Sequence, residues 1–250
     1  MWGVSSAAHL KFKFQEYVGF SGGASLGPIA PDFVHVYFGL LNPASDEVYK
    51  LSALLSEDET QRASRFHFNK NRNEFILTRG GLRTMLGSYL GISPHEIRFA
   101  YTGHGKPYLA DPPGQQLTFN VSHTDGLVAF AFGWNRAVGV DVEAVRTNFK
   151  VEEIAERFFS TAEKRSLGEF PPAERYAAFF RCWTRKEAYI KARGEGLSHP
   201  LAQFDVSLAE DPEHTLLATR PDPGEAGLWL LRPFTVPTGF AAALAVALNP

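Results

Sequence analysis

The amino-acid sequence predicts an α+β protein made of two similar halves, each an antiparallel sheet packed with helices. Strand-like apolar segments occur in both halves, capping signals place helices in one block per half, and the order strand, helices, strands occurs twice. The halves meet near residues 135–138. We therefore expect an N-terminal half over 32–137 and a C-terminal half over 138–250.

Length and composition fit this prediction. At 250 residues, of which 44% are hydrophobic, the chain is long enough to fill a sizeable core. The formal net charge of −2 argues against a general affinity for nucleic acid or anionic membranes, so any anion site must be local. Cys182 is the only cysteine, which excludes an intrachain disulfide and a cysteine-based zinc site.

The first 31 residues are predicted to form a loose arm, because Gly, Ser and Pro crowd residues 19–31. Lys11, Lys13 and Glu16 interrupt the apolar residues near the start, so the continuous apolar run of a signal peptide is missing. The apolar run at 239–248 is about half the length of a membrane span. We therefore expect a soluble, cytoplasmic protein.

Capping signals predict the helices of the N-terminal half. Ser56 and Glu59 form a capping-box pattern that starts a helical stretch, which continues after a break over 74–90 and ends at Gly91. A second, short helix is predicted from residue 93, where Ser and Pro stand together. Strands are predicted at residues 33–41, 97–102, 117–123 and 127–134.

The C-terminal half repeats this order. A strand at 138–145 precedes a helix that Ser160 and Glu163 cap, and the next helix, over 175–193, ends at Gly194. The closing strands are predicted at residues 201–209, 227–236 and 239–248.

Two acidic residues alternate with valines in the strand at 138–145. A period of two puts Asp141 and Glu143 on the same face, with α-carbons roughly 7 Å apart. Two carboxylates this close repel each other unless a cation accompanies them. Mg²⁺ suits such a site, because it binds a few carboxylates together with water and phosphate oxygens. An edge strand with a solvated acidic face is the alternative interpretation, and it stays open here.

Glu187 and Lys191 are one turn apart on the helix predicted at 175–193. Glu187 could supply a third carboxylate to a metal, and Lys191 could face a phosphate that this metal holds. A solvent-exposed ion pair on a surface helix explains the same spacing, so this pattern alone does not decide between the two.

Basic residues are concentrated between residues 62 and 83, where Glu74 is the only acid. One or two of them are expected to contact a polyphosphate, while the others are solvated or pack through their stems. The basic residues are Arg62, Arg65, Lys70, Arg72, Arg79 and Arg83.

Two further segments could bind phosphate. Residues 103–109, GHGKPYL, lack the P-loop pattern, but their glycines permit a tight turn that exposes backbone N–H groups and Lys106. Residues 119–124, FNVSHT, end a strand with Ser122 and His123, which can both hydrogen-bond a phosphate. A Ser-His-Asp hydrolase is not expected, because no G-x-S-x-G elbow surrounds Ser122.

The motifs GKPYL, FNVSHT, GVDVE, RFFS and WTRKEAYIK, in this order and at these separations, resemble the 4′-phosphopantetheinyl transferase family, in particular its long, surfactin-synthetase-activating (Sfp) type. The resemblance covers residues 33–245. It implies a monomeric pseudo-dimer of two α+β halves, with an active-site cleft for coenzyme A between them. It also implies transfer of the 4′-phosphopantetheine arm of coenzyme A to a serine of an apo acyl or peptidyl carrier protein, with release of adenosine 3′,5′-bisphosphate.

The resemblance implies roles for the acidic residues and Lys191. Asp141, Glu143 and Glu187 would hold Mg²⁺ on the pyrophosphate. Glu187 would also help to remove the proton from the carrier serine, and Lys191 would neutralise or protonate the departing phosphate.

The resemblance also implies a coenzyme A site, in which Lys106 and His123 are the expected side-chain contacts. Two positions depart from the family pattern, since Glu59 and Phe75 stand where we align nucleotide contacts. The residues implied to bind coenzyme A are Arg62, His104, Gly105, Lys106, Pro107, Tyr108, Leu109, Ser122, His123, Thr124, Asp125, Glu187 and Lys191.

Two other functions stay open at this point. A non-catalytic module that binds coenzyme A or a carrier protein would need the cleft, but not three acids and Lys191. A Mg²⁺-dependent nucleotide hydrolase would need a positioned water rather than a docking surface for a carrier.

Overall fold

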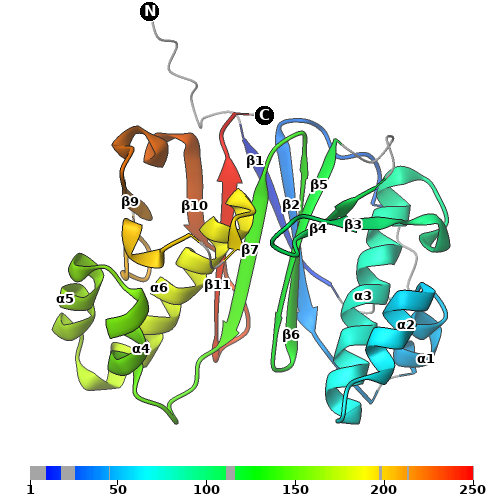
Figure 1. The fold of residues 1–250 in the computed structure, drawn as a ribbon, viewed down its shortest axis with the longest axis horizontal. Coiled ribbons are helices and arrows are strands. Elements are labelled where there is room, and N and C mark those ends of the chain that lie inside the picture. The colour runs from blue at the N-terminus through cyan, green and yellow to red at the C-terminus, as the bar shows by residue number, and fades with distance from the viewer. Residues whose placement is uncertain are drawn as a thin grey trace, which may run out of the picture.

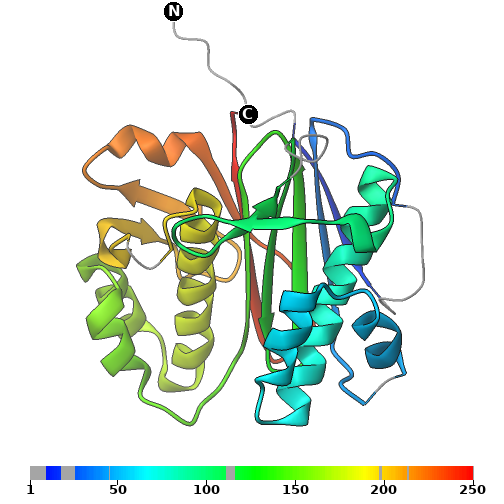
Figure 2. The ribbon, with the colours of Figure 1, turned by 45° about the vertical axis from the view of Figure 1, so that its right-hand side comes forward.

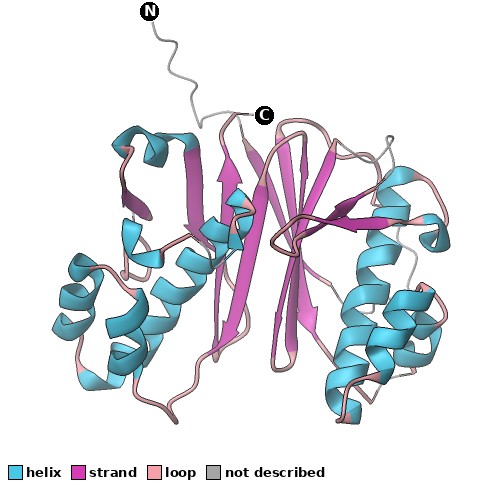
Figure 3. Cartoon of the chain, viewed as in Figure 1, coloured by secondary structure: helices cyan, strands magenta, loops and turns pink. Residues whose placement is uncertain are grey.

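The computed structural model describes residues 10–17, 26–44, 46–110, 116–196, 199–212 and 214–249. Within these residues the fold is mixed α+β, with several sheets packed against helices (Figure 1). The larger helices form two blocks on opposite sides of the molecule, and the longest strands run between them (Figure 3). The α+β class predicted from the sequence is confirmed.

A four-stranded sheet with the order β1-β2-β6-β5 belongs to the first half of the chain. The predicted strands β2 (Phe33–Leu40), β5 (Leu117–Thr124) and β6 (Leu127–Trp134) are confirmed, and β6 pairs antiparallel with both of the others. β1 (Lys11–Glu16) pairs parallel with β2, so this sheet is mixed, and the prediction of a purely antiparallel sheet was wrong.

Strand β1 also corrects the prediction of a loose arm over residues 1–31. Phe12 and Phe14 alternate with Lys11 and Lys13, so one face of the segment packs on the core while the other meets solvent. This alternation stabilises a strand where we expected a loose segment. Residues 1–9 and 18–25 of the predicted arm lie outside the described residues.

Helices α1 (Glu47–Ser52), α2 (Glu57–Ser64) and α3 (Asn69–Leu90) cover this sheet on one side (Figure 2). The predicted capping box of Ser56 and Glu59 starts α2, and Gly91 ends α3 in a left-handed conformation, with φ of 67°. The predicted short helix is a 3-10 turn, η2 (Pro94–Glu96).

A two-stranded hairpin of β3 (Phe99–Tyr101) and β4 (Pro107–Leu109) follows η2. No strand was predicted at β4, which lies in the segment 103–109 where we expected a tight turn. The hairpin extends from the side of α3 across the strands towards α6 (Figure 2). It therefore joins the two helical blocks.

The second half of the chain contains an antiparallel sheet with the order β10-β11-β7. Its strands are β7 (Val138–Ala144), β10 (Trp229–Pro233) and β11 (Phe240–Ala247), all within predicted strands. A small sheet pairs β8 (Phe204–Val206), the strand part of the predicted 201–209, with β9 (Leu216–Thr219). The turns η5 (Leu201–Gln203) and η6 (Pro223–Leu228) complete this region.

Three helices accompany the second sheet: α4 (Val151–Phe158), α5 (Thr161–Glu169) and α6 (Pro172–Arg193). The predicted capping box of Ser160 and Glu163 starts α5, and Gly194 ends α6 with φ of 78°. α6 lies against β7 and β11. Among the described helices, none combines the length and the apolar character needed to cross a membrane.

Gly139 lets α6 approach β7 closely. The valines of β7 are buried in the apolar layer shared with β2 and β6, whereas Gly139 faces α6. A β-carbon at residue 139 would lie 2.1 Å from the carbonyl oxygen of Ala188 and 2.3 Å from the amide nitrogen of Ala192. Only glycine fits there, and Asp141 and Glu143 share this strand face because side chains alternate.

The two larger sheets meet where their edge strands β5 and β7 lie side by side (Figure 1). Side chains of β5 bond to the backbone of β7. Asn120 Oδ1 accepts a hydrogen bond from the N–H of Val140 at 2.8 Å, and Ser122 and Thr124 accept from the next N–H groups on that edge, of residues 142 and 144. This junction fixes β5 and β7 relative to each other.

Candidate active site

Charged residues of β7 and α6 meet next to β5. Lys191 Nζ donates to Asp141 Oδ1 at 2.6 Å and lies 3.0 Å from Ser122 Oγ. Ser122 Oγ donates to the same carboxylate oxygen at 2.8 Å. Thr124 Oγ1 donates to Glu143 Oε2 at 3.2 Å. The structure thus connects β5, β7 and α6 through a polar network of residues that the sequence singled out.

This geometry decides between the alternatives that the sequence left open for the acids of β7 and for Lys191. Asp141 is only 3% exposed, so β7 does not present a solvated acidic face at this residue. Lys191 pairs with Asp141 rather than forming a solvent-exposed pair with Glu187 on the same helix. The structure therefore shows neither a solvated acidic face at Asp141 nor a surface ion pair between Glu187 and Lys191.

Burial raises the pKa of each acid in the cluster, and repulsion by the neighbouring acids adds to the rise at Glu143 and Glu187. Desolvation raises the pKa of Asp141, although Lys191 and Ser122 oppose it. Desolvation, followed by the charge of Asp141, raises the pKa of Glu143, and the same two causes raise the pKa of Glu187 to about 7. Three acids around one ammonium make a site that favours an additional cation.

The donor atoms of these acids fit Mg²⁺, whereas their present arrangement does not form a complete metal site. Asp141 Oδ2 is buried without a hydrogen-bond partner, and carboxylate oxygens are the ligands that Mg²⁺ prefers. In the described part of the chain, no three His, Cys, Asp or Glu side chains are grouped as a ready metal site. The Lys191 ammonium contacts Asp141 in this arrangement, so a bound cation requires Lys191 and the acid side chains to adjust.

The raised pKa of Glu187 predicts how stability depends on pH in metal-free buffer. Between pH 4.5 and about 7 the folded carboxyl keeps its proton while the unfolded one loses it, so this group makes stability fall as pH rises. We expect Glu187→Gln to reduce that fall when urea unfolding is measured across this range in EDTA. Glu153→Gln, at an exposed carboxylate, is the matched control. An unchanged pH dependence in Glu187→Gln would contradict the shift.

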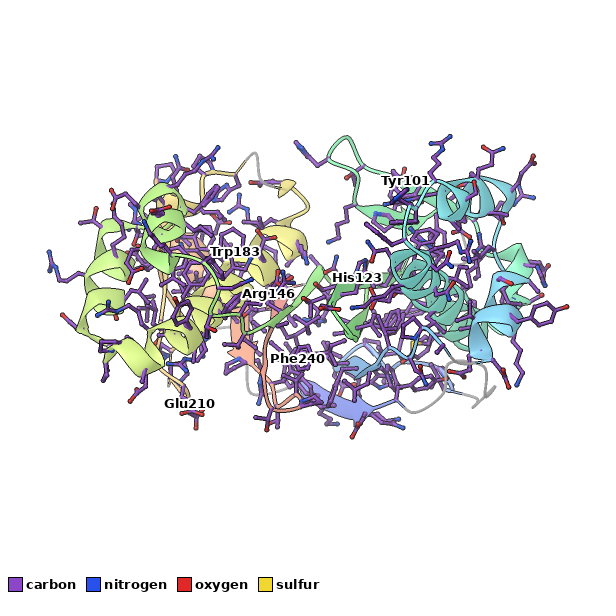
Figure 4. The ribbon with its side chains drawn as sticks, turned by 90° about the horizontal axis from the view of Figure 1, so that it is seen from below. Tyr101, His123, Arg146, Trp183, Glu210 and Phe240 are labelled. Atoms are coloured by element: carbon purple, nitrogen blue, oxygen red, sulfur yellow. The ribbon has the colours of Figure 1, made fainter. Side chains whose placement is uncertain are left out.

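His123 lies near the acid cluster at the end of β5. Its side chain is exposed, and Figure 4 shows it near the middle of the molecule. Neighbouring protein atoms, then the charges of Lys191 and Arg62, lower the pKa of His123. The structure thus brings His123 and Arg62 towards the same region as Lys191.

The basic residues of α2 and α3 divide into two groups. Arg79 and Arg83 form ion pairs with Glu59, which is 3% exposed, so they stabilise the helix packing. The guanidinium of Arg62 is exposed and lies 5.2 Å from the ring centre of Phe75. Glu59 and Phe75, the two departures from the family pattern, are therefore packing partners of these arginines.

Asp125 sits in the β5–β6 turn and forms an ion pair with Lys70 at the start of α3. Both side chains are more than half exposed. The ion pair lowers the pKa of Asp125 and connects the hairpin turn to the first turn of α3.

A cavity of about 380 Å³ adjoins Glu143. Arg146 is its basic residue, and aromatic rings make up much of its wall, including Trp183, which stacks on Phe179. Figure 4 shows Trp183 on α6, on the side of the molecule opposite Tyr101. The cavity offers a mostly apolar space beside the acids.

Comparison with known proteins assigns the family. One family model, described as the 4′-phosphopantetheinyl transferase superfamily, matches residues 137–245, and a second, for the N-terminal region of 4′-phosphopantetheinyl transferases, matches residues 41–134. The 4′-phosphopantetheinyl transferase HetI of Nostoc sp. is 37% identical over 217 residues, which cover 86% of this chain and 88% of HetI. The chain belongs to the 4′-phosphopantetheinyl transferase family.

Two further relatives in this family come from Bacillus subtilis. The 4′-phosphopantetheinyl transferase ffp is 32% identical over 178 residues, covering 68% of this chain and 77% of ffp. The 4′-phosphopantetheinyl transferase Sfp of strain 168 is 30% identical over 168 residues, covering 67% of this chain and 73% of Sfp. The resemblance inferred from the motifs is confirmed.

The structure of this family member does not bring Lys106 into the acid cluster. Its ammonium donates to three backbone carbonyls, and burial lowers its pKa to about 8. The rest of the predicted 104–109 segment is arranged as the glycines suggested, with Gly105 at φ of 80° in the turn. His104 and Tyr108 are exposed, while Leu109 is buried.

Sequence reasoning missed two residues that build this candidate site. Gly139 sets the distance between β7 and α6, and a glycine inside a strand pattern is the signal that could have revealed it. The second residue is Asn120, whose Oδ1 accepts a hydrogen bond from the N–H of Val140. Its period of two with Ser122 and Thr124 was visible in the sequence, but only the structure shows which strand this polar face meets.

Proposed function

We propose that this chain transfers the 4′-phosphopantetheine arm of coenzyme A to a serine of an apo acyl or peptidyl carrier protein and releases adenosine 3′,5′-bisphosphate. The network of Asp141, Lys191 and Ser122, with Glu143 and Glu187 beside it, is the observation that carries this proposal. It combines excess acid for a cation with an ammonium for a phosphate. Relatives named as 4′-phosphopantetheinyl transferases over most of the chain support it.

Asp141, Glu143 and Glu187 are the residues proposed to hold Mg²⁺. The unpartnered Oδ2 of Asp141 and the mutual repulsion of the three acids support this assignment. When bound, the ion would neutralise charge on the pyrophosphate of coenzyme A.

Glu187 is proposed to accept the proton of the carrier serine. Its carboxyl lies on α6, next to the acids of β7, and remains partly exposed, so an incoming hydroxyl can reach it. Lys191 is proposed to release Asp141 and to donate to the phosphate oxygen that leaves with the adenosine bisphosphate, where negative charge grows.

The nucleotide is proposed to lie along the end of β5 and the start of the first helical block. Ser122, His123, Thr124 and Asp125 line this path, with Arg62 opposite. The 104–109 hairpin would cover it with backbone groups. The apolar cavity beside Glu143 suits the flexible pantetheine arm.

The finer architecture is part of the same proposal. We propose a pseudo-dimer of the halves 32–137 and 138–250, with coenzyme A between them and residues 1–31 as an arm that contributes β1. The protein is also proposed to act in the cytoplasm and as a monomer, and the monomer is favoured because two halves in one chain would provide both walls of the site.

Transfer is expected to depend on a divalent cation. Incubation with coenzyme A, Mg²⁺ and an apo carrier should raise the intact mass of the carrier by one phosphopantetheine group. Excess EDTA should abolish the mass change, and added Mg²⁺ should restore it, since three acids alone repel the pyrophosphate. Persistence of transfer in EDTA would contradict the metal role.

The same assay separates the other functions. A binding module would retain coenzyme A in a filtration assay and leave the carrier mass unchanged. A nucleotide hydrolase would cleave coenzyme A without any carrier. Either result would overturn the transferase assignment.

A further inference from the structure

Lys106 connects the β3–β4 hairpin to the two elements that carry the charged site residues. Its Nζ lies 2.6 Å from the carbonyl oxygen of Lys191, 3.2 Å from that of Val138 and 3.3 Å from that of Ala192. Val138 is the first residue of β7, and the other two belong to the last turn of α6. The Lys106 ammonium thus contacts the backbone of both β7, which carries Asp141 and Glu143, and α6, which carries Glu187 and Lys191.

These contacts use the full donor capacity of the side chain. An ammonium has three N–H donors, and three carbonyl oxygens surround this one. The last carbonyls of a helix lack partners within the helix and carry partial negative charge, so a cation is favourable there. A direct contact between Lys106 and a nucleotide phosphate would require these bonds to break.

The turn that carries Lys106 is shaped for this contact. Thr102 closes the turn, accepting from the N–H of Lys106 through Oγ1 at 3.1 Å and donating its own N–H to the Lys106 carbonyl at 2.9 Å. Glycines face it from the end of α6: a β-carbon at Gly194 would lie 3.8 Å from Lys106 Cδ, and one at Gly196 would lie 3.5 Å from His104 Cβ. The hairpin therefore packs closely on the loop after α6.

We propose that Lys106 is a positioning residue: its ammonium fixes the hairpin, the start of β7 and the last turn of α6 in one arrangement, and so holds Lys191 where it meets the leaving phosphate. The kinetic part of this inference rests on the proposed function. The structural part does not, because the three contacts join groups of this chain alone.

The decisive variant is Lys106→Met, which keeps most of the apolar stem and removes the ammonium. Hydrogen exchange in the absence of coenzyme A and metal should become faster at the amides of residues 102–108 and 188–194. In the transfer assay, kcat at saturating substrates should fall roughly 10- to 100-fold, the range expected when a catalytic group is displaced by about 1 Å. Lys106→Arg should recover part of both losses, because it keeps a cation.

A comparison of substrates separates positioning from direct binding. The ratio of kcat/KM for coenzyme A to that for 3′-dephospho-coenzyme A should be the same in the wild type and in Lys106→Met. Lys11→Met, at an exposed lysine paired with Asp32 on β1, is the control and should change neither exchange nor kinetics.

Unchanged exchange, combined with a higher KM for coenzyme A and a loss of the preference for the 3′-phosphate, would overturn the proposal in favour of a nucleotide contact. If Lys106→Met does not fold, Lys106→Gln, which keeps two donors on a shorter stem, takes its place with the same expected outcomes. If the wild type transfers nothing, the proposed function fails, while the exchange measurement still tests the contact of Lys106 with α6.

Discussion

Gly139→Ala is expected to destabilise the protein by more than about 3 kcal/mol, at or beyond the upper end of the usual cost of overpacking. The added β-carbon would lie 2.1 Å from the carbonyl oxygen of Ala188, and backbone atoms of a long helix cannot move aside singly. α6 would have to shift away from β7 as a unit, which also separates Lys191 from Asp141. Urea unfolding should show the loss of stability, and the carrier mass assay should show the loss of transfer.

Gly168→Ala is the matched control for this substitution. Gly168 lies in α5, and a β-carbon there would meet nothing within 4 Å. Alanine should be neutral or stabilise the helix by roughly 0.5–1 kcal/mol. Near-wild-type stability and transfer in Gly139→Ala would show that α6 does not need its close approach to β7.

Lys191→Ala is expected to lower kcat by about 10² to 10³ at saturating coenzyme A and carrier, with a modest change in the affinity for coenzyme A. The reason is that its proposed contact strengthens only as charge builds on the leaving phosphate, and removing one such donor costs about this factor. Steady-state kinetics with Mg²⁺ present provide the measurement.

Lys164→Ala serves as the comparison for Lys191→Ala. Lys164 pairs with Glu156, whose side chain is 75% exposed, and pairs of this type contribute at most about 1 kcal/mol. We expect its kcat to equal that of the wild type. A near-normal kcat in Lys191→Ala would show that the ion pair of Lys191 with Asp141 stabilises the structure and does not contribute to turnover.

Local signals in the sequence predicted most of the fold. The capping boxes at Ser56 and Ser160 and the left-handed glycines at 91 and 194 act over a single turn, so their meaning does not depend on distant residues. Strand β1 was missed because the prediction of a loose arm rested on the Gly, Ser and Pro residues at 19–31, although Phe12 and Phe14 alternate with Lys11 and Lys13 before that segment.

The candidate site was predicted less completely than the fold. Spacing alone placed Asp141 with Glu143 and Glu187 with Lys191, but not the pair of Lys191 with Asp141, which depends on the height of α6 over β7. The surroundings of the Lys106 ammonium could not be predicted from its neighbours in the sequence either. A lysine beside a glycine turn looks free to bind an anion, and only the position of α6 reveals that carbonyls surround its ammonium.

The junction of β5 with β7 has a consequence for self-association. Each of these strands is the edge of its sheet, and an open edge can recruit a strand from another molecule. Here the side chains of Asn120, Ser122 and Thr124 already occupy the N–H groups on the facing edge of β7, so the two edges protect each other. In the two larger sheets of the described chain, β1 and β10 are the edges that this junction leaves open, and β1 carries Lys11 and Lys13, charges that discourage strand pairing.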